Sequence, residues 1–171
     1  MNRKANRKKN YNYSSVGYYF VTICTQDQLT LFGEIENNKM ILNEYGEIVK
    51  KCWSEIPEHF QNVEINEFMV MPNHLHGIIV INDFVGNRHA CSLQNTHENR
   101  QHQELPVIIG SYKSAVTKLI HRKADNSFQW QKSYYDHIIR DESSLNRIQG
   151  YIRQNPQNWD NDKNNMLFCD L

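Results

Sequence analysis

Residues 63–81 read VEINEFMVMPNHLHGIIVI, and this stretch decides the fold. Both halves are dominated by the β-branched and large apolar residues that favour strands, whereas Pro72 and Asn73 between them favour a turn. We therefore expect two strands, at 63–71 and 74–81, that pair with each other across a tight turn. This pair is the expected centre of the sheet.

Further strands and three helices are expected on either side of this pair. The additional strand-like segments, rich in β-branched and aromatic residues, are 18–25, 32–36, 39–42, 128–131 and 135–140. Helical spacing of apolar residues predicts helices at about 43–60 and 106–123, and a third that begins at Asp141 or Glu142 and ends at Pro156. Strands and helices without strict alternation predict an α+β domain, with helices packed on one face of an antiparallel sheet.

The composition is typical of a soluble protein of the cell interior. The chain has 171 residues, which suits one domain, and no segment approaches the roughly 20 apolar residues that cross a membrane. No secretory signal begins the sequence, and the four cysteines lack the spacing of a zinc ribbon or a disulfide scaffold: Cys24, Cys52, Cys91 and Cys169. We expect a cytoplasmic protein without membrane contact, present as a monomer or a homodimer.

Positive charge is concentrated in two places, although 19 basic and 19 acidic residues give a net charge of zero. The N-terminal arm, residues 1–12, contains no acidic residue and five basic ones: Arg3, Lys4, Arg7, Lys8 and Lys9. The polar face of the expected second helix is also basic: Lys113, Lys118, Arg122 and Lys123. Both places could contact DNA phosphates, but a basic terminus and a charged helix face are more often simply solvated.

His74 and His76 are the sharpest local feature. Residues two apart on a strand point to the same face, so both imidazoles can reach one metal ion while Leu75 points into the opposite layer. Histidines at this spacing also occur by chance, because imidazole serves as an ordinary hydrogen-bonding side chain. The metal interpretation therefore needs support from elsewhere in the sequence.

The expected third helix supplies that support through Tyr151 and Asn155. These residues are four apart and so share one side of the helix, beside its apolar stripe. Taken singly, Tyr151 is equally well a residue at the rim of the core, and Asn155 a helix stop before Pro156. Taken with His74 and His76, they suggest two imidazoles and an amide oxygen that hold a divalent cation beside a phenol.

The chemistry explains why these residue types belong together. A phenol has a pKa of about 10, so it is a weak nucleophile unless a nearby positive charge favours the phenolate. A bound ion also stabilises the charge that develops on an attacked phosphate. Nitrogen and oxygen ligands together favour Mg²⁺ or Mn²⁺ over a closed structural zinc site.

With these motifs the sequence resembles the single-tyrosine transposases of the HUH family. The resemblance runs from about residue 10 to residue 159 and is carried by residues 71–77, MPNHLHG, and residues 151–156, YIRQNP. Residues 110–113, GSYK, and 134–141, YYDHIIRD, belong to it as well. Insertion-sequence members carry glutamine at the position of Asn155, so the chain is more similar to the REP-associated tyrosine transposases.

The resemblance implies a ferredoxin-like fold in which the tyrosine helix packs on the sheet face that carries the two histidines. It implies that Tyr151 attacks single-stranded DNA, often beside a hairpin, and forms a 5′-phosphotyrosine link with release of a 3′-hydroxyl. Asn155 matches the third ligand of a Mg²⁺ or Mn²⁺ ion by position. We expect a catalytic domain at 13–156 with a polar, variable loop at 83–104, followed by a polar tail at 157–171.

Two alternatives remain open. A ferredoxin-like module could grip hairpin DNA or RNA without catalysis, by means of the basic arm and aromatic residues. Tyr134, Tyr135 and His137 could serve in this way, or be ordinary residues of a half-buried strand. A metal-dependent hydrolase would use water in place of the tyrosine. Formation of a covalent protein–DNA adduct distinguishes the transposase-like enzyme from both.

Overall fold

The computed structural model describes residues 16–83, 104–123, 126–162 and 164. Most of the expected 83–104 loop and the end of the chain lie outside the described residues. The five basic residues predicted to contact DNA from the N-terminal arm also lie outside them: Arg3, Lys4, Arg7, Lys8 and Lys9. Within the described ranges, every helix is too short or too polar to cross a membrane.

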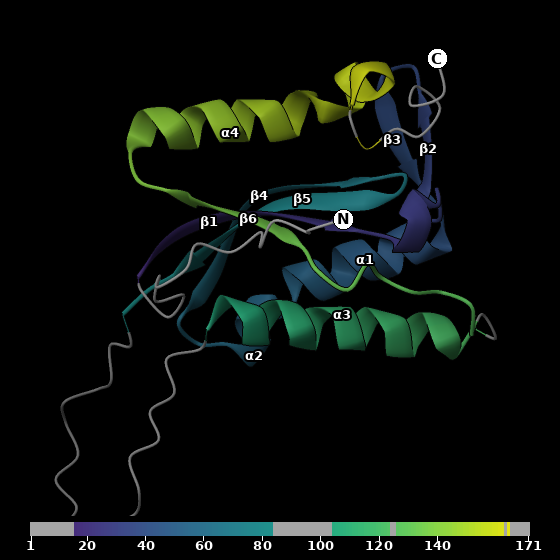
Figure 1. Ribbon diagram of the computed structural model, residues 1–171, viewed down its shortest axis with the longest axis horizontal. Helices are drawn as coiled ribbons and strands as arrows, with labels where there is room; N and C mark the ends of the chain where they lie inside the picture. The colour runs from purple at the N-terminus through teal and green to yellow at the C-terminus, as the bar shows by residue number, and fades with distance from the viewer. Residues whose placement is uncertain (1–15, 84–103, 124–125, 163, 165–171) are drawn as a thin grey trace, which may run out of the picture.

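A four-stranded antiparallel sheet forms the middle layer of the protein (Figure 1). Its strands, in spatial order, are β4 (Val63–Met71), β5 (His74–Ile81), β1 (Gly17–Cys24) and β6 (Tyr135–Ile139). The predicted pair at 63–71 and 74–81 is confirmed as β4 and β5, and β5 lies inside the sheet between β4 and β1.

A separate hairpin and two helices connect β1 to β4. After the short 3-10 helix η1 (Gln26–Gln28), β2 (Gly33–Glu36) pairs with β3 (Lys39–Leu42), and the left-handed backbone of the two asparagines between them makes the predicted tight turn. Helix α1 (Glu44–Ser54) begins where the Asn43 side chain accepts hydrogen bonds from two backbone N–H groups. The expected helix at 43–60 breaks at Glu55 and continues as α2 (Ile56–His59).

The helices lie on both faces of the sheet (Figure 1). Helices α1 and α3 (Leu105–His121) cover one face, as predicted, and give the β-α-β-β-α-β order of a ferredoxin-like domain. Helix α4 (Glu142–Gln154) lies on the other face, against a smaller apolar cluster of Phe20, Ile78, Ile139 and Ile152. The second cover matches the burial of β5, because every residue of this strand is buried and both of its sides are therefore covered.

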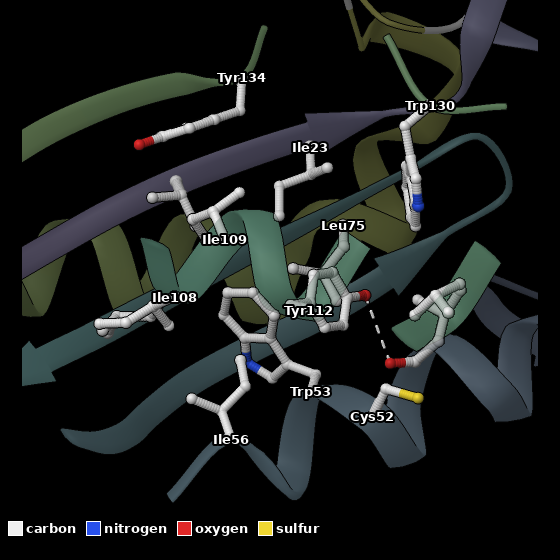
Figure 2. Close-up of a cluster of buried hydrophobic side chains, with 14 of the residues drawn as sticks. Ile23, Cys52, Trp53, Ile56, Leu75, Ile108, Ile109, Tyr112, Trp130 and Tyr134 are labelled. Atoms are coloured by element: carbon white, nitrogen blue, oxygen red, sulfur yellow. Dashed lines mark hydrogen bonds between the residues drawn. The ribbon is translucent and has the colours of Figure 1, made fainter. Parts of the chain in front are cut away.

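The larger core lies between the sheet and α1 and α3 (Figure 2). Trp53 and Tyr112 meet at its centre with their rings nearly perpendicular, and the Tyr112 hydroxyl donates to the carbonyl of Val49. The Trp53 ring lies directly on Gly77 of β5, where any Cβ atom would overlap it. Leu75 enters the same core, so β5 is held from this side by residues that alternate with His74 and His76.

Helix α4 begins and ends close to the predicted residues. Asp141 caps its first turn by accepting from the backbone N–H of Ser144. The helix ends at Gln154, and the chain continues through Asn155 and Pro156 as the 3-10 helix η2 (Asn155–Asn161). Of the segment expected as a strand at 128–131, only an isolated bridge between Trp130 and Thr25 is present.

Candidate active site

Strand β5 directs His74 and His76 to the sheet face on which α4 lies. Leu75 between them is fully buried in the opposite core, as the alternation of a strand predicts. Both imidazoles are also buried, and their Nε2 atoms lie 3.0 Å apart. The predicted convergence of the two rings on one point is therefore present.

Each imidazole is oriented by a hydrogen bond at its other nitrogen. Asn73 Oδ1 lies 2.7 Å from His74 Nδ1, and an amide oxygen only accepts, so this Nδ1 donates and Nε2 is the atom that could bind a cation. The Asn73 side-chain nitrogen donates to the carbonyls of Gln28 and Asn164, which holds the amide in this orientation. Thr22 Oγ1 lies 2.8 Å from His76 Nδ1. Such outer partners are typical of metal-binding histidines.

The arrangement of these atoms fits one divalent cation. Two ligand atoms about 2.1 Å from an ion and about 90° apart are about 3.0 Å from each other, and the two Nε2 atoms have this separation. Asn155 Oδ1 is buried and has no hydrogen-bond partner among the described residues. A buried polar atom left in this state costs about 1–3 kcal/mol, and a cation would satisfy it. The nitrogens of His74 and His76 and the amide oxygen of Asn155 are the kinds of donor atom that the sequence predicted.

Asp162 joins this cluster, and the sequence analysis missed it. Its Oδ2 lies 4.0 Å from His74 Nε2, while its Oδ1 accepts from the backbone and side-chain N–H groups of Asn164. Ligand atoms of His74, His76 and Asp162 all lie within 4.8 Å of one another. Asp162 is thus a candidate third ligand beside Asn155. The signal available in the sequence is weak, a carboxylate within the run NWDND at 158–162.

Helix α4 places the Tyr151 hydroxyl 3.2 Å from His76 Nε2. The Tyr151 ring packs against the rings of Phe20 and His76, and the residue remains 42% exposed. The phenol and both imidazoles belong to one chain.

The surroundings of Tyr151 keep its phenol protonated. Burial and the Asp162 carboxylate raise the pKa of Tyr151 above its ordinary value, and a hydrogen bond from the Asn155 side chain opposes this rise. At neutral pH the hydroxyl is consequently a poor nucleophile by itself. A cation held at the candidate site near His76 would favour the phenolate and so oppose this rise in pKa.

A cavity of about 410 Å³ opens beside Tyr151. Its volume lies within the range of small-ligand pockets, roughly 300–1,000 Å³. Aromatic and polar side chains from β1, β5, β6, α4 and η2 line it: Phe20, Thr22, His76, Tyr135, Tyr151, Asn155, Asn158, Asn161 and Asp162. Tyr135 is exposed in this cavity, whereas the neighbouring Tyr134 is buried in the main core.

The structure does not bring the basic residues of α3 to this site, because α3 lies on the opposite side of the sheet from α4 (Figure 1). Lys113 donates to the backbone carbonyls of Gln131 and Lys132, and burial lowers its pKa. Lys123 forms an ion pair with Glu44. Lys118 and Arg122, the other two basic residues predicted to contact DNA phosphates, are exposed.

Comparisons with known proteins agree with this fold. No protein-family model matches the chain. A Haemophilus influenzae protein, described as an uncharacterized protein, is 42% identical over 165 residues, which are 94% of this chain and 92% of that protein. A solved structure of a REP-associated tyrosine transposase bound to a REP hairpin is similar with a TM-score of 0.55 and 17% identity, over 90% of this chain and 74% of that one. At this identity the likeness shows a shared fold.

Proposed function

We propose that this chain, which belongs to the same family as the Haemophilus influenzae protein, is a metal-dependent enzyme that cuts and rejoins single-stranded DNA. The proposal agrees with the fold that the chain shares with a REP-associated tyrosine transposase. The observation that carries the proposal is the position of Tyr151. Its hydroxyl lies 3.2 Å from His76 Nε2, beside the point where the two imidazoles converge. A phenol beside a candidate cation site can attack a phosphate, because a bound metal ion activates the phenol and stabilises the developing charge.

In the proposed reaction the Tyr151 oxygen attacks the phosphorus of a phosphodiester, and the bond from phosphorus to the 3′ oxygen breaks. The phenol loses its proton and the leaving 3′ oxygen gains one, so the products are a 5′-phosphotyrosine link and a free 3′-hydroxyl. Attack of a 3′-hydroxyl on this link reverses the step and rejoins a strand. Because the number of phosphoester bonds does not change, the reaction needs no ATP.

The roles proposed for the other residues follow from their contacts. His74 and His76, with Asn155 or Asp162, would hold Mg²⁺ or Mn²⁺, which when bound stabilises charge on the attacked phosphate and favours the phenolate. Asn73 orients His74, and Thr22 orients His76, each through a hydrogen bond at the Nδ1 atom of the imidazole.

The proposed substrate is single-stranded DNA beside a hairpin. The similar transposase is bound to a REP hairpin, and the cavity of this chain borders the Tyr151 hydroxyl. We assign the basic arm at 1–12 to phosphate contacts that position the substrate without taking part in the chemistry. Lys118 and Arg122 are exposed and are proposed as weaker contacts, for DNA that extends around the edge of the sheet.

The test is a search for a covalent adduct with end-labelled oligonucleotides. If a 5′-phosphotyrosine link forms, a 3′-end label must migrate with the denatured protein, whereas a 5′-end label must appear on a shorter strand with a free 3′-hydroxyl. Cleavage without an adduct would favour a hydrolase that uses water. Binding with neither product would favour a non-catalytic module. Tyr151→Phe is the control that assigns the adduct to this residue.

A further inference from the structure

We propose that the cavity beside Tyr151 binds one unpaired nucleobase of the DNA strand, next to the bond that is cut. This inference rests on the proposed function and adds a binding site to it. The base would lie against the ring of Tyr135, and its polar edge would meet the side-chain amides of Asn158 and Asn161. Three observations lead to this assignment.

The first observation is an aromatic wall. Phe20 lies at its centre, with Tyr151 and Tyr135 nearly perpendicular to it at ring-centroid distances of 6.2 and 6.4 Å. Phe20 is buried, but Tyr135 is 46% exposed although it lies on a sheet strand at the cavity. An exposed ring beside a cavity offers the flat apolar surface on which a nucleobase stacks.

The second observation is a row of amides on η2. A 3-10 helix has three residues per turn, so residues three apart lie above one another on the same side. Asn155, Asn158 and Asn161 have this spacing, and all three line the cavity. An amide offers both donors and acceptors, which match the edges of nucleobases. Asn155 is buried, whereas Asn158 and Asn161 are exposed, so these two amides are open to a ligand in the cavity.

The third observation is the charge of the cavity. Among the described residues that line it, none is a lysine or an arginine, and Asp162 is the acidic one. A phosphate would be repelled here unless a cation were bound, whereas a neutral base would not be. The base must also be unpaired, because in a duplex the neighbouring base pairs cover the face that would stack on Tyr135. The cavity therefore suits the base, and the adjacent cation site suits the phosphate.

The experiment uses isotope-labelled protein titrated by NMR in the presence of a chelator, so that cleavage is not required. The probes are the four 5′-deoxynucleoside monophosphates, 2-deoxyribose 5-phosphate and inorganic phosphate. Because stacking of a base on an aromatic ring contributes about 1–3 kcal/mol, at least one nucleotide should bind about five- to a hundredfold more tightly than the sugar phosphate. The side-chain amide signals of Asn158 and Asn161 should shift with that nucleotide.

Matched variants separate the base site from general effects. Tyr135→Ala should remove the advantage of the nucleotide over the sugar phosphate, and Tyr135→Phe should retain it. Tyr18→Ala is the control, because Tyr18 is an exposed tyrosine on the same sheet face. It lies four residues, or about 13 Å, along β1 from Thr22, the residue that pairs with Tyr135. For the amides, Asn161→Ala should alter the preference among the four bases, whereas the exposed Gln157→Ala on η2 should not.

Equal affinity for sugar phosphate and nucleotide would overturn the proposal, as would a Tyr135→Ala variant that is folded and keeps the full advantage. Absence of any amide shift with all four nucleotides would do the same. These results are independent of the adduct assay. Adduct formation without base binding removes the base site alone, and base binding without an adduct removes the proposed reaction while the base site stands.

Discussion

The hydroxyl oxygen of Tyr151 lies 3.2 Å from Nε2 of His76, a residue 75 positions earlier in the chain. Two exposed polar contacts link α4 to β4 near this approach: Arg153 pairs with Glu67, and Gln149 donates to Asn66. The nucleophile of the proposed reaction is thus tied to an edge strand, while the histidines lie on the neighbouring inner strand.

Replacing Tyr151 with phenylalanine should remove strand cleavage and the covalent adduct and leave DNA affinity nearly unchanged. The variant loses the attacking oxygen, but its ring still packs against Phe20 and His76. Cleavage on denaturing gels and affinity by fluorescence anisotropy measure the two properties. Tyr18→Phe removes an exposed hydroxyl outside the cavity and should cleave normally. Wild-type cleavage by Tyr151→Phe would assign the nucleophile to another group.

Replacing either histidine with alanine should lower metal-dependent cleavage by more than about 100-fold, since loss of an outer partner alone typically costs 10–100-fold. The fold should persist, because His74 and His76 lie outside the main apolar core. Circular dichroism reports the fold, and calorimetric titration with Mn²⁺ reports the site. Full cleavage in excess chelator would contradict any role for a metal.

Replacing Thr22 with valine keeps the shape of the side chain and removes the hydroxyl that contacts His76 Nδ1. We expect Mn²⁺ affinity to fall by about 10- to 100-fold, because the imidazole loses the partner that orients it. Thr117→Val on α3 is the matched control, since its hydroxyl donates to the Lys113 carbonyl of the same helix. Equal metal affinity of Thr22→Val and wild type would show that this hydroxyl does not orient the ligand.

The third ligand can be assigned by cleavage across a Mn²⁺ titration. We expect Asn155→Ala to need more metal and to recover partly at high concentration, because its buried oxygen has no other partner among the described residues. Tyr151→Phe should not recover at any concentration. Asn155→Gln should recover poorly, since the longer side chain misplaces the oxygen. If Asp162→Ala shifts the metal requirement and Asn155→Ala does not, the carboxylate is the ligand.

Deletion of residues 1–9 should weaken DNA binding without changing the rate of the chemical step at saturation. Each phosphate contact that is lost should reduce the slope of log affinity against log salt by roughly 0.7 for a single strand. Binding at several salt concentrations measures this slope. An unchanged slope would mean that the basic arm makes no phosphate contact.

The strands and the place of Tyr151 beside the two histidines could be predicted because they depend on local patterns. Strand alternation alone separates His74 and His76 from Leu75, and helical spacing alone predicts that Tyr151 and Asn155, which both line the cavity, share one side. Periodicity predicted helices on one face of the sheet only, and the position of α4 on the histidine face was implied by the family resemblance.

The remaining features depend on contacts between distant segments. Asp162 reaches His74 because Asn73 binds the carbonyl of Asn164, 91 residues away, and no local pattern signals such a contact. Lys113 appeared to be a free charge on a helix face, but the carbonyl of Gln131 comes from another segment and binds its ammonium group. Periodicity predicts the face of an element, and it does not predict what will lie against that face.

The packing of the Trp53 ring on Gly77 has a consequence for the history of the family. His76 and Gly77 are adjacent, so a side chain added at 77 must displace either the ring or the strand that holds the imidazole. Among natural relatives we expect glycine to persist at this position wherever tryptophan occupies position 53, and the two to change together when they change. Selection for the proposed reaction would then also act on Trp53 and Gly77, whose contact lies on the side of the sheet opposite the candidate site.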